Sequence, residues 1–378
     1  MPTATKPKVL ILGAGFGGLE AASTLSNAMG DDLDITLIDR DESFVFGFAK
    51  LDVMFGKALP KDVKNPYTKI RHAGVTFVNA TITRIDPASR VVTTDVGEFD
   101  ADAIVIALGA DLAPDATPGL LDNGDEFYSV SGVERLRETL PKFNGGNIVI
   151  GVSGSPFKCP PAPSEAALML DSYLRHRGSR DTATITLAMP LPIPIPPSPD
   201  ASKSILERFQ QRDIAFVPHT QVVGLDPGMA HLAGGGSLPF DLYLGVPIHR
   251  PPAVLVEAGF SEDGWIPVDS RTMATAFPNV FAVGDCASVG TPKAGVFAER
   301  QAKAVAENLI AQFRGAEPVS RYDGWGTCYI EFGDEGVARV DVHFLEGTPT
   351  GQLQAPSPQL TAEKQSFGPT RIARWFDA

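Results

Sequence analysis

The sequence predicts an α/β protein with two units of parallel strands crossed over by helices, followed by a small α+β part at the C-terminus. The first unit begins with an apolar run at Lys8–Leu12, a glycine-rich turn and a second apolar run at Asp34–Asp39. The second unit repeats this order with Asn147–Ile150, a helical segment at Ser164–Arg177, and Ala183–Ala188. Strand, turn, helix and strand in this order indicate a βαβ crossover. The 378 residues suffice for two or three such domains.

In the first unit, Leu19–Leu25 is predicted to form the first turns of a helix. Gly74–Arg84 and Arg90–Thr94 are predicted as strands, and the apolar run Ala103–Leu108 as another buried strand that ends at a glycine.

In the second unit, Ser164 is predicted to cap the helix at its N-terminus, with Gly178 just past its end. Six prolines at Pro190–Pro199 predict an extended loop. Later elements are predicted at Asn279–Val283 (strand), Gly295–Phe313 (helix), Tyr329–Phe332 and Val337–Val342 (strands), and then a Pro-rich tail in which Pro369 interrupts a helix.

Composition excludes several classes of protein. Hydrophobic residues make up 43% and charged residues 20%, which is typical of a folded globular chain, and no run of 18 apolar residues is present. The net charge of −13 opposes binding of nucleic acid. Three cysteines are too few for a disulfide framework, and the start of the chain lacks an export signal, so a cytoplasmic location is expected. The histidines lack metal-ligand spacing, so no metal is predicted.

The turn after the first strand, Gly13-Ala14-Gly15-Phe16-Gly17-Gly18, matches G-x-G-x-x-G. In this pattern Gly13 permits the tight turn, Gly15 lets a pyrophosphate approach the helix N-terminus, and Gly18 lets helix and strand pack closely. Asp39, 24 positions after Gly15, ends the next strand and can accept hydrogen bonds from a ribose. The whole arrangement predicts a Rossmann-like dinucleotide-binding domain.

Two further segments indicate which dinucleotide binds. Thr275–Asp285 resembles the second FAD signature of flavoproteins with two dinucleotide-binding domains, and Ala103–Ala110 resembles their short linking motif. The resemblance implies a discontinuous FAD domain (1–110 and 245–318), an inserted NAD-domain-like domain (111–244) and a C-terminal interface region (319–378). The residues expected to contact FAD, besides Gly13, Gly15, Gly18 and Asp39, are Arg40, Gly109, Gly284, Asp285, Lys293, Ala294 and Gly295.

The inserted domain departs from the dinucleotide-binding pattern. After its first strand the chain continues as Gly151–Pro161, which lacks G-x-G-x-x-G. Prolines at 156, 160 and 161 remove backbone donors where a pyrophosphate would need them. A nicotinamide cofactor is therefore not expected, although the fold is expected to be retained.

Cys159 lies in this turn, just ahead of the predicted helix, where a thiol is favoured as thiolate. Its segment, Pro156–Glu165, resembles the cysteine segment of the sulfide:quinone oxidoreductase and flavocytochrome c sulfide dehydrogenase family. Gly326–Tyr329 resembles the segment of that family's second redox cysteine, here Cys328. The segments Gly245–Pro252 and Pro292–Glu299 and the tail at Phe367–Phe376 extend the likeness over nearly the whole chain.

The resemblance implies an FAD-dependent oxidoreductase that oxidises sulfide or a related sulfur species. Cys159 and Cys328 would form a redox-active pair, Glu165 would act as a general acid or base, and Lys293 would stabilise reduced flavin. Simpler roles remain open: a helix-dipole partner for Glu165, a solvated loop position for Lys293 and a buried thiol for Cys328. Because residues 44–48 hold no cysteine, non-covalent FAD is expected.

Electrons would pass to a quinone. The alternatives are a flavoprotein subunit donating to a cytochrome, a type II NADH dehydrogenase-like enzyme, and a non-enzymatic FAD-binding relative. The third cysteine of many quinone-reducing members is absent from residues 111–150, which favours the cytochrome alternative. The tail Glu363–Phe376 mixes aromatic and basic residues, so a weak peripheral contact with the inner face of a membrane is expected. A homo-oligomer is possible.

Overall fold

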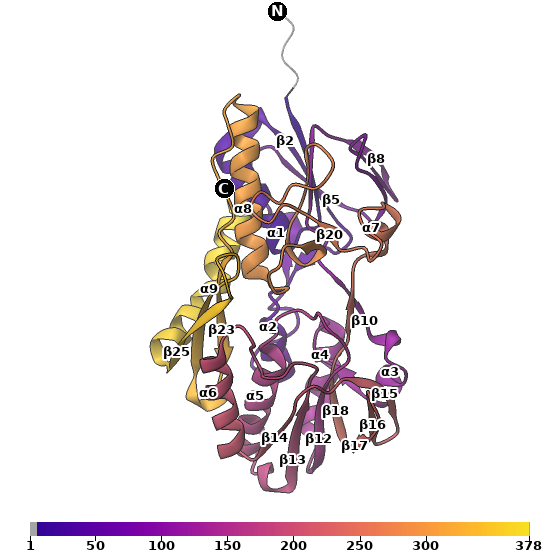
Figure 1. Ribbon diagram of the computed structural model, residues 1–378, viewed down its shortest axis with the longest axis vertical. Coiled ribbons are helices and arrows are strands. Elements are labelled where there is room, and N and C mark those ends of the chain that lie inside the picture. Colours follow the sequence, from indigo (N-terminus) through magenta and orange to yellow (C-terminus); the bar gives the residue numbers. More distant parts are fainter. Residues whose placement is uncertain (1–5, 378) are drawn as a thin grey trace, which may run out of the picture.

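Two five-stranded parallel sheets, one above the other in Figure 1, form the centres of two lobes. The computed structural model describes residues 6–377, so residues 1–5 of the segment searched for an export signal lie outside it. The upper sheet has the order β21-β9-β1-β2-β5. Its strands are β1 (Lys8–Leu12), β2 (Asp34–Asp39), β5 (Val75–Asn79), β9 (Ala103–Ile106) and β21 (Val280–Ala282). Strand β21 comes from far along the chain, so the upper sheet is built from two separate segments of the sequence.

The lower sheet has the order β11-β18-β12-β13-β14. Its strands are β11 (Asp125–Glu126), β12 (Gly146–Val152), β13 (Ala183–Ala188), β14 (Ile214–Val217) and β18 (Leu242–Val246). The predicted α/β class with two Rossmann-like cores is confirmed. The exact domain boundaries remain a prediction.

Helices cover these sheets and line the junction between the lobes (Figure 1). They are α1 (Phe16–Met29), α2 (Ala49–Met54), α3 (Leu120–Asn123), α4 (Val130–Thr139), α5 (Ala162–His176), α6 (Pro199–Gln211), α7 (Ala253–Glu257), α8 (Gly295–Phe313) and α9 (Pro358–Phe376). Helix α8 has the predicted bounds and packs along α1. Helix α1 begins at the glycine turn itself, three residues before the predicted Leu19.

Helix α5 also begins earlier than predicted, and this corrects the role of Ser164. The chain enters the helix at Ala162 with Pro161 as the N-cap residue. Ser164 is fully buried inside the first turn, and its hydroxyl has no hydrogen-bond partner among the described residues. Pro161 has φ −66° and ψ −25°, and a proline such as Pro163 suits the first turn of a helix, so the helix begins before the serine.

Short strands, most of them paired antiparallel, complete the two lobes. In the upper lobe the predicted strand Gly74–Arg84 is two strands, because the chain leaves the parallel sheet at Ala80. The short strands of both lobes are β3 (Ser43–Phe44), β4 (Asn65–Pro66), β6 (Ile82–Asp86), β7 (Val91–Thr94), β8 (Gly97–Asp100), β15 (Val222–Asp226), β16 (Met229–Leu232), β17 (Ser237–Pro239), β20 (Ile266–Pro267) and β22 (Ala287–Ser288). The lobes are joined by the antiparallel pair β10 (Asp111–Ala113) and β19 (Ile248–Arg250).

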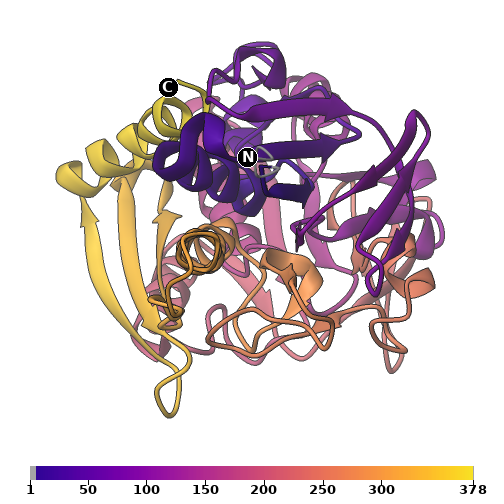
Figure 2. The ribbon, with the colours of Figure 1, turned by 90° about the horizontal axis from the view of Figure 1, so that it is seen from above.

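The C-terminal part is a three-stranded antiparallel sheet with a long helix. Its strands are β23 (Trp325–Glu331), β24 (Val337–His343) and β25 (Thr350–Ser357). Figure 2 shows the yellow helix α9 lying beside the indigo helix α1, which it contacts. The predicted interruption at Pro369 is wrong, because the proline lies inside α9. A proline removes one backbone hydrogen bond, and here tertiary packing of the helix outweighs that loss.

Two aromatic side chains near the end of α9 account for this packing. Trp375 and Phe376 are 1% and 3% exposed and belong to the core of the upper lobe. Trp375 Nε1 donates a hydrogen bond to Glu20 Oε2 at 2.6 Å, and Arg374 pairs with the same carboxylate at 2.7 Å. The predicted membrane contact is therefore wrong for these two aromatic residues, which are not available to a membrane surface.

Candidate active site

A cavity of about 1000 Å³ lies between the upper and lower lobes. It is lined by residues from both lobes and from the C-terminal sheet. Almost every residue predicted for the site lines it, namely Gly13, Gly15, Asp39, Arg40, Gly109, Cys159, Glu165, Gly284, Asp285, Lys293, Ala294, Gly295 and Cys328. The exception is Gly18, whose predicted role was packing.

The glycine turn has the geometry that its pattern predicts. Gly13 has φ +98°, and a Cβ added there would lie 2.5 Å from the carbonyl oxygen of Ala107. A Cβ on Gly18 would lie 1.8 Å from the carbonyl oxygen of Gly13. A Cβ on Gly15, by contrast, would meet no described atom within 4 Å, so the turn leaves open space at this residue.

Helix α1 begins beside that open space. No side chain of the described residues caps its N-terminus at Gly15, so its first backbone N–H groups are free to bind an anion. Glycine turn, helix N-terminus and cavity together fit the pyrophosphate of a dinucleotide.

Asp39 braces the glycine turn. Its Oδ2 accepts a hydrogen bond from Ala14 N at 2.6 Å, and its Oδ1 accepts one from Asp41 N at 2.9 Å. Burial raises the pKa of this carboxyl, and the two backbone donors oppose that rise. A carboxylate oxygen can accept more than one hydrogen bond, so these two contacts are compatible with the ribose contact, which stays a prediction.

Residues from the other FAD-like segments lie around the same cavity. Arg40 forms an ion pair with Asp111 at 2.8 Å. Gly284 has φ +76°, and a Cβ there would lie 2.9 Å from Ala298 Cβ. Gly295 begins α8 so close to α1 that a Cβ would lie 2.5 Å from the ring of Phe16.

The two predicted redox cysteines come to this cavity from different elements. Cys159 lies in the turn before α5 with φ +50°, and its backbone N–H donates to Lys293 O at 2.8 Å. Cys328 lies in β23, and both thiols line the cavity wall. The third cysteine, Cys286, is fully buried, and its thiol donates to Val283 O at 3.3 Å.

The acid–base properties of the cysteines differ from the predicted thiolate. Cys159 is exposed and lines the cavity, and desolvation by the surrounding protein, together with the charge of Glu165, raises the pKa of its thiol. Burial raises the pKa of Cys328 to about 12. Desolvation and a neighbouring carboxylate thus outweigh the helix N-terminus, and both thiols favour the protonated form.

Glu165 is 3% exposed at the start of α5. Burial raises the pKa of its carboxyl to about 7, although Lys364 and a hydrogen bond oppose the rise. In that hydrogen bond Glu331 N donates to Glu165 Oε1 at 2.9 Å. A carboxyl with a pKa near neutrality beside two thiols can exchange protons with them.

Five lysines line the cavity, namely Lys50, Lys64, Lys158, Lys293 and Lys364, and the sequence alone pointed only to Lys293. Its ammonium donates to Asp285 O and lies 3.5 Å from the ring centroid of Trp265, a cation–π contact. Lys364 pairs with Glu331 at 2.6 Å. Lys50 and Lys158 donate to backbone carbonyls. Lys158 could have been identified from the sequence because it directly precedes Cys159, whereas no motif marks Lys50 or Lys364.

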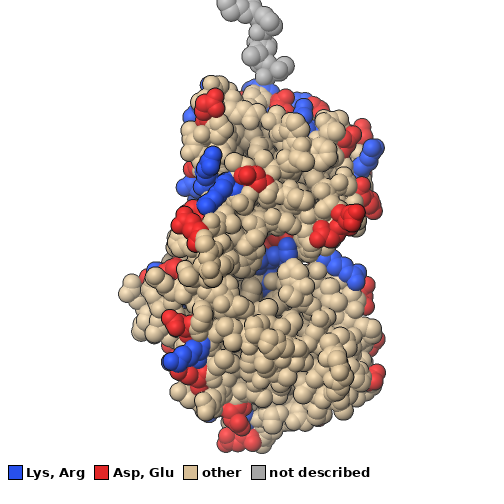
Figure 3. All heavy atoms as spheres, viewed as in Figure 1, with Lys and Arg blue, Asp and Glu red and all other residues tan. Residues whose placement is uncertain are grey.

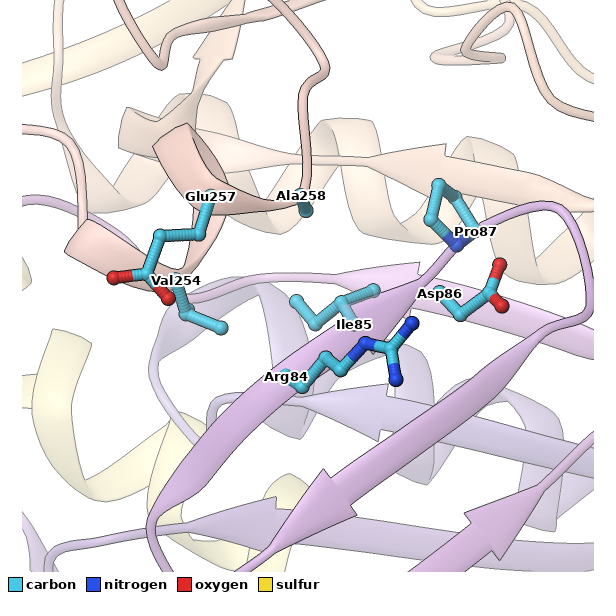
Figure 4. A pocket seen from close by; sticks show the side chains of 7 residues that line it. All are labelled: Arg84, Ile85, Asp86, Pro87, Val254, Glu257 and Ala258. Atoms are coloured by element: carbon cyan, nitrogen blue, oxygen red, sulfur yellow. The ribbon is translucent and has the colours of Figure 1, made fainter.

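A second, smaller pocket holds none of the predicted site residues. Its volume is about 260 Å³, and it is lined by Arg84, Ile85, Asp86, Pro87, Val254, Glu257 and Ala258, which Figure 4 shows between β6 and α7. The Asp86 carboxylate already accepts hydrogen bonds from Ala88 N and Ser89 N.

Among the described helices, none is long and apolar enough to cross a membrane.

Residues 7–302 match the family model of the pyridine nucleotide-disulphide oxidoreductases. The chain belongs to this family. As a member of it, the chain is an FAD-dependent oxidoreductase, and the open turn at Gly15 and the cavity fit this cofactor.

Known proteins confirm the resemblance that the cysteine segments predicted. A mitochondrial sulfide:quinone oxidoreductase of Mus musculus is 25% identical over 348 residues, which cover 86% of this chain and 76% of the relative. The crystal structure of the sulfide:quinone oxidoreductase of Aquifex aeolicus has a TM-score of 0.86 at 22% identity, covering 98% of this chain and 92% of that one. A type II NADH:quinone oxidoreductase of Staphylococcus haemolyticus is 30% identical over 135 residues, 35% of this chain and 33% of the relative.

Proposed function

We propose that this flavoprotein oxidises hydrosulfide, or a related sulfur species, through Cys159 and Cys328 and passes the electrons by way of FAD to a quinone. The observation that carries the proposal is the convergence of the two thiols, 169 residues apart in sequence, on one cavity that the glycine turn also lines. The relatives whose names describe this activity match the chain over most of its length.

The proposed reaction begins with a disulfide between the two cysteines. Hydrosulfide attacks one sulfur, so one S–S bond forms and one breaks, leaving a persulfide on one cysteine and a thiolate on the other. Removal of the outer sulfur by a second nucleophile completes the oxidation. Each hydrosulfide then yields one sulfur atom at the oxidation level of the element, one proton and two electrons.

FAD supplies the capacity to accept this electron pair. The residues that would hold it are those of the glycine turn, together with Asp285 and the start of α8. Lys293 lines the cavity and is held by Asp285 O and Trp265, and it would stabilise negative charge that arises on reduction.

Glu165 is proposed to take the proton that hydrosulfide or a thiol releases. Its carboxyl has a pKa of about 7 and is held by Glu331 N, so it can change protonation state near neutral pH without losing its position.

The aromatic wall of the cavity supports a quinone as electron acceptor. Phe48, Tyr329 and Phe367 line it, and Phe48 and Phe367 form an edge-to-face pair with ring centroids 5.8 Å apart. Flat rings with an apolar face suit a quinone head group. Cytochrome remains the second acceptor to be tested.

NADH is the less supported donor. In the lower lobe, Gly151 near the end of β12 packs closely against Tyr243. A Cβ on Gly151 would lie 2.2 Å from the hydroxyl oxygen of Tyr243. The turn that follows contains prolines in place of N–H donors.

Anaerobic titration of the purified yellow protein tests the proposal. Sulfide should bleach the flavin absorbance stoichiometrically, and a quinone analogue should restore it, whereas NADH should leave it unchanged. Reoxidation by a cytochrome but not by the quinone analogue would replace the proposed acceptor. Bleaching by NADH without any response to sulfide would overturn the function.

A further inference from the structure

Two lysines that the proposed mechanism does not use stand side by side at the cavity. Lys50 comes from α2 and Lys158 from the turn before α5, and both are half-buried and line the cavity together with Cys159. Lys158 directly precedes Cys159 in the chain. Two cations from separate elements thus lie near one thiol, and together they would attract an anion to it.

Tyr128 contacts both lysines, the side chain of Lys50 and the backbone of Lys158. Lys50 Nζ donates to the carbonyl oxygen of Tyr128, and the hydroxyl of the same tyrosine donates to Lys158 O at 2.9 Å. Lys158 Nζ donates to Ala110 O at 2.6 Å. The tyrosine is 7% exposed, so its contacts with Lys50 and with the Lys158 backbone are held in the protein interior.

Neither ammonium has a carboxylate within 4.0 Å among residues 6–377. The nearby Glu126 is already engaged, because its Oε2 accepts from Tyr128 N at 2.7 Å and from Ser129 N at 2.9 Å. Lys158 also interacts with the charge of Asp285, but beyond ion-pair distance. Each lysine thus keeps two or more donor hydrogens for another partner.

The positive charges of Lys50 and Lys158 change the pKa values of nearby groups. Burial and then Lys158 lower the pKa of Lys50 to about 8. Burial, then Lys158 and Lys50 lower the pKa of His249 to about 3, so that this histidine is neutral. Figure 3 shows blue side chains inside the hollow at the waist of the molecule, on a surface where red side chains are frequent. A protein with a net charge of −13 repels small anions at long range, and a local cationic entrance offsets that repulsion.

We propose that Lys50 and Lys158 form an anion-binding entrance beside Cys159 that recruits small sulfur-bearing anions, with hydrosulfide as the substrate. The identity of this anion rests on the proposed function, whereas the attraction of small anions to Cys159 does not. The two ammonium groups are positioning groups, since they concentrate and orient the nucleophile that the cysteines receive.

Alkylation of Cys159 tests the entrance without any need for sulfide oxidation. The FAD-loaded protein is reduced, freed of reductant under anaerobic conditions, and treated with iodoacetate, an anion, or iodoacetamide, its neutral counterpart. Peptide mass spectrometry gives the rate at which each reagent alkylates Cys159. The rate with iodoacetate is divided by the rate with iodoacetamide, and this ratio is then divided by the same ratio measured for 2-mercaptoethanol. The normalised ratio of the wild-type protein should be about 10 at low salt and should fall toward one as salt is added.

The lysine variants locate the effect. Lys50→Gln and Lys158→Gln should each lower the normalised ratio by about three- to tenfold. Lys57→Gln removes an exposed lysine just beyond the end of α2, outside the cavity lining, and should leave the ratio unchanged. The second-order rate of flavin reduction by sulfide should fall in the same two variants, with the limiting rate retained.

Three results would overturn the proposal: a wild-type ratio near one, a ratio that does not respond to salt, or a ratio unchanged in both lysine variants. If instead the variants lose FAD and keep the ratio, the lysines bind the cofactor and the entrance is wrong. If the ratio falls as expected and sulfide never bleaches the flavin, the entrance stands and the proposed substrate fails.

Discussion

Replacing Glu165 with glutamine should stabilise the protein at alkaline pH. The carboxyl is buried, and its pKa rises from an ordinary value of 4.5 to about 7. At about 1.4 kcal/mol for each pH unit, this rise corresponds to about 3 kcal/mol of unfolding free energy. Glutamine keeps the oxygen that accepts the hydrogen bond from Glu331 N and removes the charge.

The sign follows from the direction of the pKa shift. The folded protein binds the Glu165 proton more tightly than the unfolded chain does, so this contribution to stability is fully present below about pH 4.5. It is lost as the pH rises through about 7, where the folded protein must accept a buried charge. The variant should therefore be more stable than the wild type by about 3 kcal/mol at about pH 8.5 and equally stable at about pH 4.5.

Urea unfolding of the FAD-loaded protein at several pH values, followed by circular dichroism, measures the difference between the two proteins. Glu262→Gln, at an exposed position, is the matched control and should change the free energy by less than about 0.5 kcal/mol at any pH. A Glu165→Gln variant that is no more stable than the wild type at alkaline pH would refute the reasoning, as would a difference that does not depend on pH.

Three other predictions follow from the site. Cys159→Ser and Cys328→Ser should each abolish flavin reduction by sulfide with FAD still bound, the double variant should be no worse, and Cys286→Ser should retain most activity in the same stopped-flow assay. Gly18→Ala should prevent folding or FAD binding because its Cβ would lie 1.8 Å from a backbone oxygen, whereas Gly15→Ala, with open space at that atom, should fold and bind FAD more weakly by fluorescence titration. Acid precipitation should release the yellow chromophore into the supernatant, and a chromophore that stays with the protein pellet would show covalent attachment.

The sequence predicted the elements that local patterns define. The bounds of β1, β2, β13 and α8 agree with the prediction, because each is an apolar run or an amphipathic segment bounded by clear turn residues. The glycine turn was predicted down to the separate roles of Gly13 and Gly18, since its pattern encodes backbone geometry directly.

Helix α9 could not be predicted in the same way. Pro369 argues against a helix on local grounds, and what favours the helix is distant: Glu20 on α1 and Glu299 on α8. Arg371 pairs with Glu299 at 2.7 Å, and Arg374 pairs with it at 2.6 Å. Local sequence contains the cost of the proline but not the partners that offset it.

The chemistry of the site depends on such distant partners even more strongly. The protonation of Cys159 is decided by its enclosure and by Glu165, and that of Glu165 by burial, by Lys364 and by a backbone donor 166 residues away. A helix N-terminus is visible in the sequence and favours a thiolate, yet its effect is smaller than that of a buried carboxylate facing the same cavity. Residue types and spacing therefore identified which side chains meet, whereas their charges depend on how far the fold removes them from water. A thiol that is protonated at rest needs a base whose pKa is near neutrality, and Glu165 is a buried carboxyl at this cavity that meets that requirement.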